Sequence, residues 1–290
     1  MKRSLALIVA VASLLVADVA SAQSPTFREP FEWELGKGPW GIFLPGYALG
    51  TDADGNDAFQ DDLDDPGFYV QLQAVRRFLH TRTSAEFRGF YGAAGANSTA
   101  DRTGSSYLDP SSGANVNLGN GRTHLSSDVD HYGFDLALRD TWPFRIGGLS
   151  AGMAFSYFAF DQDFDVEFNS ARLFNERLES DFLGGKGFVG WDGFLFGRAS
   201  SIDLGYGYFD VDARYEYDGA AGDFSMEAGD QTGVVEFSAT TRETFNIGLV
   251  GLTIGATYIE DMPQIIRDGG TTAIGNDSAA TLTAMVEWIF

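Results

Sequence analysis

The feature that most constrains the fold of this sequence is the alternation of apolar and polar side chains in many short segments. Successive side chains of a β-strand point to opposite faces, so a period of two predicts strands with one apolar face. We predict ten such strands, at residues 40–50, 67–78, 81–91, 128–142, 148–160, 185–198, 200–213, 232–245, 248–260 and 279–290. Their lengths are close to the ~9–11 residues with which an oblique strand crosses a bilayer.

The connections between these strands are alternately long and short. Long, polar connections are predicted at 51–66, 93–127, 161–184, 214–231 and 261–278, and tight turns at 79–81, 143–147, 198–200 and 245–248. An even number of strands with this rhythm places both termini on the side of the short turns, as in bacterial outer-membrane barrels. The sequence therefore predicts an all-β fold, namely a transmembrane antiparallel up-and-down β-barrel of about ten strands with long extracellular loops and short periplasmic turns.

Aromatic residues gather near both ends of the predicted strands. Those near the short turns are Trp40, Phe78, Trp142, Phe144, Phe245, Trp288 and Phe290. Those toward the long connections are Tyr91, Tyr132, Tyr157, Tyr206, Tyr208 and Tyr258. Two such groups suit the interfacial preference of aromatic rings in membrane barrels, whereas a soluble barrel would carry its apolar face inward.

The amino-terminal residues have the pattern of a secretory signal peptide. Lys2 and Arg3 precede an apolar run, and a small-residue cleavage site follows at 20–22. No other segment approaches the ~18 apolar residues of a membrane helix, so a membrane-spanning form of this chain must be a closed barrel. The predicted organisation is a signal peptide at 1–22, an amino-terminal lead segment at 23–38 and the outer-membrane barrel at 39–290.

The carboxy-terminal strand alternates clearly and ends on an aromatic residue. Leu282, Val286, Trp288 and Phe290 share its predicted outer face, and Glu287 points to the lumen. This ending resembles the terminal strand of Gram-negative outer-membrane β-barrels, the porin-like superfamily, although no single family is selected. The resemblance implies Sec-dependent export and an integral outer-membrane location with both termini periplasmic. It also implies that the barrel-assembly machinery reads Val286, Trp288 and Phe290 as the assembly signal.

The composition is acidic and lacks cysteine. With 41 Asp and Glu against 19 Lys and Arg, the net charge of −22 argues against nucleic acid as a partner. Disulfides and thiol chemistry are excluded, because the sequence contains no Cys. The expected partners are outer-membrane lipid and lipopolysaccharide.

The first long connection is the candidate for a metal site. Its candidate ligands are Asp52, Asp54, Asn56 and Asp57. Oxygen ligands of this kind suit Ca²⁺, but Leu63 stands where an EF-hand places its bidentate Glu. The segment at 52–65 is therefore either a weak Ca²⁺ site or a solvated acidic loop, and no other cofactor is expected.

Charged residues fall on the inward face of several predicted strands. They are Arg77, Glu86, Arg88, Asp135, Arg139, Asp203, Glu236, Arg242 and Glu287. Four of them are expected at one level on neighbouring strands: Glu86, Arg88, Asp135 and Arg139. Asp203 and Arg242 are expected close together near the periplasmic rim. Opposite charges at these heights would pair, because an unpaired buried charge is costly, and the group is either the selectivity lining of a narrow pore or a salt-bridged filling.

The function favoured by this architecture is that of a narrow porin-like channel or of an envelope-structural barrel, because ten strands leave at most a narrow conduit. Small inward residues such as Gly205, Gly207 and Gly255 could leave such a conduit beside the charged group. A surface-exposed interaction or adhesion barrel is the alternative.

An outer-membrane hydrolase is the third hypothesis. Ten strands resemble the omptin proteases, whose outer rim bears an Asp pair facing an Asp–His pair. The nearest equivalents in this sequence are Asp62, Asp64, Asp128, Asp130 and His131. Adjacent residues such as Asp130 and His131 point to opposite faces of a strand, and the first pair lies in a loop. No catalytic residue is therefore assigned, and the chain is not expected to be an enzyme.

Overall fold

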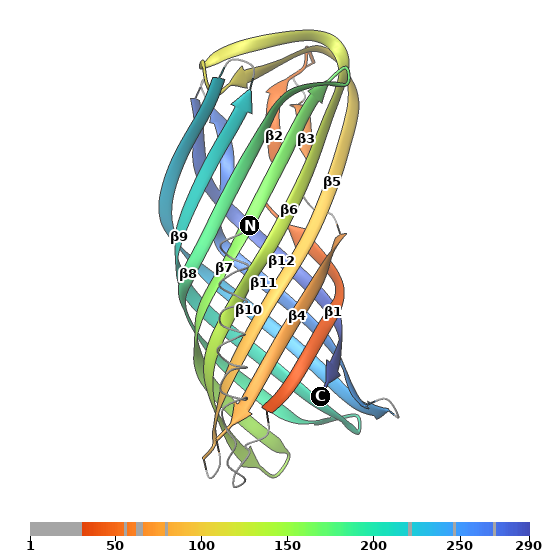
Figure 1. The fold of residues 1–290 in the computed structure, drawn as a ribbon, viewed down its shortest axis with the longest axis vertical. Helices are drawn as coiled ribbons and strands as arrows, with labels where there is room; N and C mark the ends of the chain where they lie inside the picture. The colour runs from red at the N-terminus through yellow and green to blue at the C-terminus, as the bar shows by residue number, and fades with distance from the viewer. Residues whose placement is uncertain are drawn as a thin grey trace, which may run out of the picture.

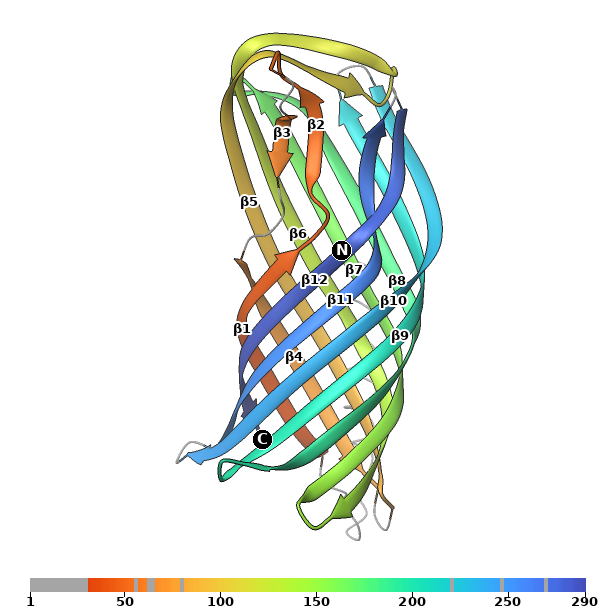
Figure 2. The same ribbon diagram turned by 180° about the vertical axis from the view of Figure 1, so that it is seen from behind.

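The computed structural model describes residues 31–54, 57–61, 66–78, 81–219, 222–245, 248–268 and 271–290, so the predicted signal peptide lies outside it. Within these residues ten long strands form one antiparallel ring (Figure 1 and Figure 2). They are β1 (Phe31–Phe43), β4 (Pro66–Arg77), β5 (Thr83–Asp109), β6 (Ala114–Phe144), β7 (Gly147–Phe168), β8 (Ala171–Leu195), β9 (Arg198–Gly219), β10 (Gly222–Phe245), β11 (Gly248–Asp268) and β12 (Thr271–Ile289). Each pairs with the next, and β12 pairs back to β1, which confirms the predicted up-and-down barrel.

Most strands are far longer than a bilayer requires. β6 contains 31 residues and β12 contains 19, against the ~9–11 that cross a membrane obliquely. The connections expected at 93–127, 161–184, 214–231 and 261–278 are therefore mostly β-hairpin instead of irregular loop. Polar and apolar residues still alternate there, but the apolar ones point inward. On β7, for example, Asp165 lies outside while Phe164 and Val166 are buried.

Two of the four predicted tight turns lie wholly within the described residues. Residues 145–146 join β6 to β7, within the predicted turn, whereas β8 and β9 are joined by residues 196–197, so the predicted turn at 198–200 is wrong and these residues begin β9. The turns near 79–81 and 245–248 include residues outside the described part of the chain.

The first strand begins earlier than the sequence predicted. β1 starts at Phe31, so residues 31–38, which we expected in the lead segment, belong to the barrel wall. The expected strand at 40–50 is interrupted at Pro45, whose missing N–H cannot join a sheet ladder. Trp40 lies on the same face of β1 as Gly36, the partner of the inward-facing Glu287, so it faces the lumen, is almost fully buried and is not part of an interfacial girdle.

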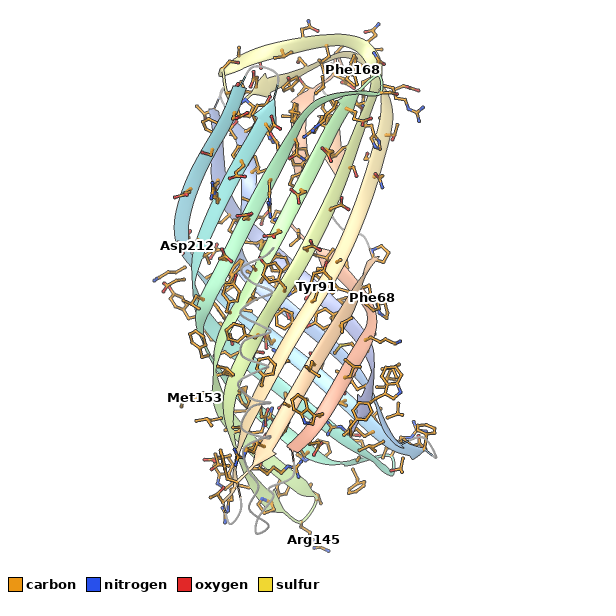
Figure 3. All side chains as sticks on the ribbon, viewed as in Figure 1. Phe68, Tyr91, Arg145, Met153, Phe168 and Asp212 are labelled. Atoms are coloured by element: carbon orange, nitrogen blue, oxygen red, sulfur yellow. The ribbon has the colours of Figure 1, made fainter. Side chains whose placement is uncertain are left out.

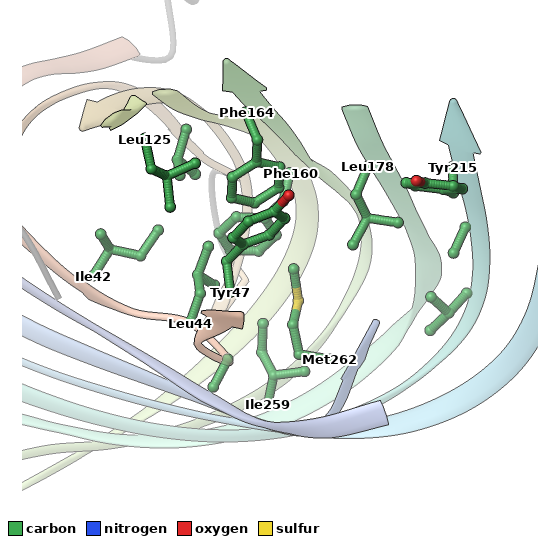
Figure 4. Close-up of a cluster of buried hydrophobic side chains, with 14 of the residues drawn as sticks. Ile42, Leu44, Tyr47, Leu125, Phe160, Phe164, Leu178, Tyr215, Ile259 and Met262 are labelled. Atoms are coloured by element: carbon green, nitrogen blue, oxygen red, sulfur yellow. The ribbon is translucent and has the colours of Figure 1, made fainter. Parts of the chain in front are cut away.

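A short hairpin folds back into the mouth of the barrel. Its strands, β2 (Tyr47–Thr51) and β3 (Asp57–Asp61), pair with each other, and β2 also pairs with β5. Its almost fully buried apolar side chains are Leu44, Tyr47, Leu49, Ala58 and Phe59. They pack against inward-facing residues of the wall such as Phe164 and Met262 (Figure 4). We call residues 44–54 and 57–61 the plug.

The tip of the β5–β6 hairpin crosses the mouth above the plug, as Figure 1 and Figure 2 show at the top. The pairing is irregular between Arg102 and Ser106, opposite Gly119, whose φ of +77° lies in the region that favours glycine. Beyond this bend the ring of Tyr107 lies 5.0 Å from that of Phe174 on β8. The plug is therefore covered from above.

The barrel wall divides into two regions along its axis. The belt region has a largely apolar outer surface and comprises residues 31–43, 66–78, 81–91, 132–157, 183–208, 233–245, 248–258 and 280–290. The rest of the wall, with the plug, is the mouth region, where Ile266 is the single exposed large apolar side chain among the described residues. Figure 3 shows Met153 and Phe68 projecting from the belt region and Asp212 from the mouth region.

Candidate functional site in the barrel lumen

A cavity of about 190 Å³ occupies the lumen of the belt region. Its charged lining residues are Glu34, Glu86, Arg88, Asp135, Arg139, Lys186, Asp203, Glu236, Arg242 and Glu287. Aromatic side chains line its upper end: Tyr69, Phe90, His131, Phe158 and Phe160. This aromatic layer and the plug above it separate the charged cavity from the mouth of the barrel.

The upper charges of the cavity form a balanced group of two cations and two anions. Arg88 and Asp135 are partners in the β5–β6 register, and the Arg88 Nε lies 2.6 Å from Asp135 Oδ2. Arg88 also reaches across the lumen to Glu236 on β10, at 3.1 Å. Lys186 contacts the same two carboxylates, at 3.0 Å to Asp135 and 2.6 Å to Glu236. The four side chains connect β5, β6, β8 and β10 through the interior.

A second group lies below the first and contains more anions than cations. Arg139 Nε lies 2.9 Å from Glu86, and its Nη1 lies 2.6 Å from Asp203. The guanidinium also lies 4.7 Å above the ring centroid of Phe188, a cation–π arrangement. One arginine thus serves two carboxylates, and its packing on an aromatic ring fixes its position.

The four residues expected at one level form two pairs instead, Arg88 with Asp135 and Arg139 with Glu86, and the second pair lies below the first. The structure does not bring Asp203 and Arg242 together. Their strands are staggered, and Arg242 instead binds Glu34 of β1, at 2.9 Å.

One predicted residue of the group lies outside the cavity, and two residues that line the cavity were not predicted. Arg77 lies at the rim, where its 73% exposed side chain is 3.4 Å from Glu32. The sequence did not predict Lys186, because both faces of the segment at 185–198 consist largely of apolar residues or Gly, so its inward face could not be assigned. It did not predict Glu34, because that residue fell in the expected lead segment.

The carboxy-terminal strand lies at the closure of the barrel. Val286 and Phe290 are exposed on the outer surface, whereas Glu287 is only 3% exposed and faces the lumen. Phe290 and Trp33 of β1 exchange two backbone hydrogen bonds, at 2.8 and 3.3 Å. The outer face of Val286, Trp288 and Phe290 is thus available to a partner, and its reading by the assembly machinery stays a prediction.

The candidate Ca²⁺ segment is only partly described. Asp52 Oδ1 accepts a hydrogen bond from the Asp54 backbone N–H at 2.9 Å, and Asp52 Oδ2 lies 3.5 Å from Arg102. Asn56 and the side chain of Asp57 lie outside the described part. Among the described residues no group of three or more His, Asp or Glu side chains is arranged to hold a metal, and Ca²⁺ binding by this segment stays a prediction.

The residues considered for a rim hydrolase are separated by the barrel wall. His131 is buried in the aromatic layer, 4.1 Å from the ring of Phe160, with Nδ1 3.0 Å from the Ala159 carbonyl oxygen. Asp130 points outward and accepts a hydrogen bond from the Tyr91 hydroxyl at 2.5 Å. Asp62 and Asp64 lie outside the described residues.

A buried polar group holds the plug to the wall of the mouth region. Glu176 of β8 is fully buried and forms an ion pair with Arg267 of β11. The hydroxyls of Tyr47 in the plug and Tyr215 in β9 each donate to Glu176 at 2.7 Å. Burial and then the Glu176 carboxylate raise the pKa of both tyrosines above their ordinary value of 10.0. These contacts place a residue of the plug in the same network as three wall strands.

No protein-family model and no curated protein matches the sequence. Among solved structures, the outer membrane protease OmpT from Escherichia coli is similar with a TM-score of 0.62 and 9% identity, over 93% of this chain and 100% of that chain. A Pseudomonas aeruginosa FadL homologue has a TM-score of 0.30 and 9% identity, over 91% of both chains. The monoaromatic hydrocarbon channel CymD has a TM-score of 0.34 and 11% identity, over 91% of this chain and 89% of that chain.

The similarity to OmpT shows the fold of this chain, which is that of Gram-negative outer-membrane β-barrels. No helix in the described part of the chain is long and apolar enough to cross a membrane.

Proposed function

We propose that this protein is an integral outer-membrane barrel that is closed by its plug and serves envelope structure and surface interaction through its mouth region. The observation that carries the proposal is the plug itself. It fills the upper lumen with apolar side chains, where a diffusion pore would need a continuous polar path.

The outer surface of the belt region supports the membrane location. Side chains such as Met153, Leu204 and Leu252 are more than half exposed on it, which suits contact with lipid. The short turns lie at the belt end of the barrel, which supports periplasmic termini and turns. The outward face of the carboxy-terminal strand supports recognition by the barrel-assembly machinery.

The contacts of the plug support a permanently closed mouth. Tyr47 stacks on Phe164 with 4.3 Å between ring centroids and donates to the buried Glu176. Removal of the plug would expose this apolar core and leave Glu176 with one fewer donor, and both changes are costly.

The outer surface of the mouth region supports the interaction role. Its strands present acidic side chains in rows, and on β9 these are Asp210, Asp212, Glu216 and Asp218. They are separated by two or four residues and therefore lie on one face, together with Arg214, which pairs with Glu216. We propose that this surface contacts lipopolysaccharide or another envelope component, since it stands immediately above the apolar belt.

The proposal is tested by complementation of a deletion strain, with sensitivity to large hydrophilic antibiotics as the readout. We expect the deletion to raise sensitivity, and a variant with Asp210→Lys and Asp212→Lys to fold without restoring resistance. A matched lumen variant, Glu86→Gln with Arg139→Gln and Asp203→Asn, removes the lower charge group together and is expected to restore it. Restoration by the surface variant but not by the lumen variant would contradict the proposal.

A narrow channel is the second candidate, favoured by the polar cavity in the belt region. Planar bilayer recordings of the purified, folded protein distinguish the two. The closed barrel predicts a silent bilayer. The channel predicts discrete conductance steps that change in size when Arg88 or Arg139 is replaced, and such steps would replace the first proposal by the second.

A further inference from the structure

Glu287 lies in a space prepared for its side chain at the seam of the barrel. Its partners in the two neighbouring strands are Gly36 of β1 and Gly251 of β11. A Cβ atom on Gly251 would lie 3.0 Å from Glu287 Oε2, and one on Gly36 would lie 3.2 Å from Glu287 Cγ. Because both neighbours are glycines, the carboxylate can lie across the inner surface of the wall and line the cavity.

This carboxylate lacks a sufficient partner. The Thr253 hydroxyl hydrogen-bonds to it. Glu287 Oε2 is nevertheless buried and has no hydrogen-bond partner among the described residues. Arg242, the cation of this part of the lumen, is bound to Glu34. Burial of a charge without a partner is strongly unfavourable, so a cation bound beside Glu287 would be stabilised by this carboxylate.

The charged side chains that line the cavity include more anions than cations. The lining contains six carboxylates, namely Glu34, Glu86, Asp135, Asp203, Glu236 and Glu287, and four cationic side chains, namely Arg88, Arg139, Lys186 and Arg242. The upper group is balanced, so the two missing positive charges belong to the lower lumen around Arg139 and Glu287.

We propose that a hydrated divalent cation, of the Mg²⁺ type, binds in the lower lumen beside Glu287. Mg²⁺ characteristically keeps several waters and is held by one or two carboxylates, which fits Glu287 with Glu34 as the second acidic neighbour. The cavity is many times larger than the ~10–15 Å³ that one water requires, so the ion can keep most of its waters. Thr253 supplies a further oxygen. The site joins β1, β11 and β12, and the ion therefore stabilises the closure of the barrel.

The test is thermal unfolding of the folded, full-length mature protein in detergent, measured in EDTA, in MgCl₂ and in CaCl₂. A ligand that binds only the folded form stabilises it in proportion to ln(1 + [L]/Kd), so an ion at ten times its Kd should favour folding about tenfold. We expect the unfolding midpoint to rise with MgCl₂ in the millimolar range, and Glu287→Gln to abolish that rise. Glu86→Gln is the matched control in the same cavity, and it should keep most of the rise.

Other outcomes identify a different site or no site. An unfolding midpoint of the wild-type protein that is the same in EDTA, MgCl₂ and CaCl₂ would overturn the proposal. So would a full rise in Glu287→Gln that is lost in Asp52→Asn with Asp54→Asn, because the ion would then bind the acidic segment of the mouth. If Glu287→Gln does not fold, Thr253→Val decides: a reduced rise supports the site, and an unchanged rise contradicts it.

Discussion

The belt region and the mouth region of this barrel are built from the same strands with opposite polarity. In the belt region the outer surface is apolar and the lumen holds ion pairs, as between Arg88 and Asp135. In the mouth region the outer surface is acidic and the lumen holds an apolar core with the plug at its centre. One β-strand periodicity therefore builds two regions, and an apolar outer face in one with an acidic outer face in the other is the pattern expected of a wall that passes from lipid into water.

β7 shows the exchange within a single strand. Phe155 in the belt region is 48% exposed on the outer surface, and Phe164 in the mouth region is 2% exposed in the core. The odd-numbered residues Phe155 and Asp165 both face outward, and the pairing of β7 is regular between them, since its register against β8 shifts only beyond Val166. Only the chemistry of the two faces is exchanged.

The largest predicted effect is the loss of the buried ion pair in the mouth region. Glu176→Ala leaves Arg267 buried without its partner and removes the acceptor of two tyrosine hydroxyls. We expect a loss of about 3–5 kcal/mol in the free energy of unfolding. Urea unfolding in lipid vesicles, followed by tryptophan fluorescence, measures it. A loss below about 1 kcal/mol would mean that the plug is not held by this group.

A charge placed on the outer surface tests the boundary between the regions. Met153→Arg on β7 puts a cation in the apolar belt and should cost about 2–4 kcal/mol. Asp165→Arg on the outer face of the same strand lies in the mouth region and should cost less than about 0.5 kcal/mol. The same urea measurement compares the two variants. Equal losses in the free energy of unfolding would show that the outer surfaces of the belt region and the mouth region do not differ in polarity.

Replacing a phenylalanine by leucine changes the shape of a side chain but not its polarity, so it tests whether that side chain is packed in a core. Phe164→Leu loses a ring contact with Tyr47 worth about 0.5–1.5 kcal/mol and leaves a small gap. Phe155→Leu lies on the exposed outer surface of the belt region and loses only a tilted contact with Phe134, at 6.3 Å between ring centroids, so its effect should be smaller. If the two variants lose the same stability, the mouth region is not packed as a core.

Alkaline pH should destabilise the mouth region selectively. The raised pKa values of Tyr47 and Tyr215 mean that the folded protein keeps both protons where the unfolded chain loses them. Their contribution is fully present below about pH 10 and declines above it, by about 1.4 kcal/mol per tyrosine and pH unit. Tyr47→Phe should reduce the slope of stability against pH by the contribution of one tyrosine, about 1.4 kcal/mol per pH unit. An unchanged slope would show that the hydroxyl of Tyr47 does not titrate with unfolding.

The smallest predicted effect concerns the ion pair at the rim. Arg77 and Glu32 are both exposed to solvent, and such pairs contribute less than about 1 kcal/mol. Arg77→Ala should therefore leave the urea midpoint nearly unchanged in high salt, in contrast to Glu176→Ala.

The sequence was sufficient to predict the barrel fold but not the length of its strands. The alternation at 67–78 and 279–290 predicted strands and faces that the structure confirms. The alternation continues just as regularly through 214–218, with Tyr215 and Tyr217 inward and Glu216 and Asp218 outward. The sequence nevertheless predicts a connection from residue 214 onward, because a bilayer requires only about ten residues per strand and a polar outer face carries no membrane signal.

The candidate site could be predicted only where its partners are neighbours in the sheet. Arg88 and Asp135 pair across adjacent strands, so counting from a turn brought them to one level. The contacts from Arg88 to Glu236 and from Arg139 to Asp203 cross the lumen. Such contacts depend on the stagger and width of the closed barrel, which the pattern of a single strand does not contain.

The most direct test of the exchanged polarity uses the absence of cysteine from the natural sequence. Single cysteines are placed at Asp165 and Val166, neighbours on opposite faces of β7 in the mouth region, and labelled in proteoliposomes with a water-soluble maleimide. We predict rapid labelling of Asp165→Cys, and labelling of Val166→Cys that becomes comparably fast only after unfolding. Equal rates at the two positions in the folded protein would contradict an apolar core and a closed mouth.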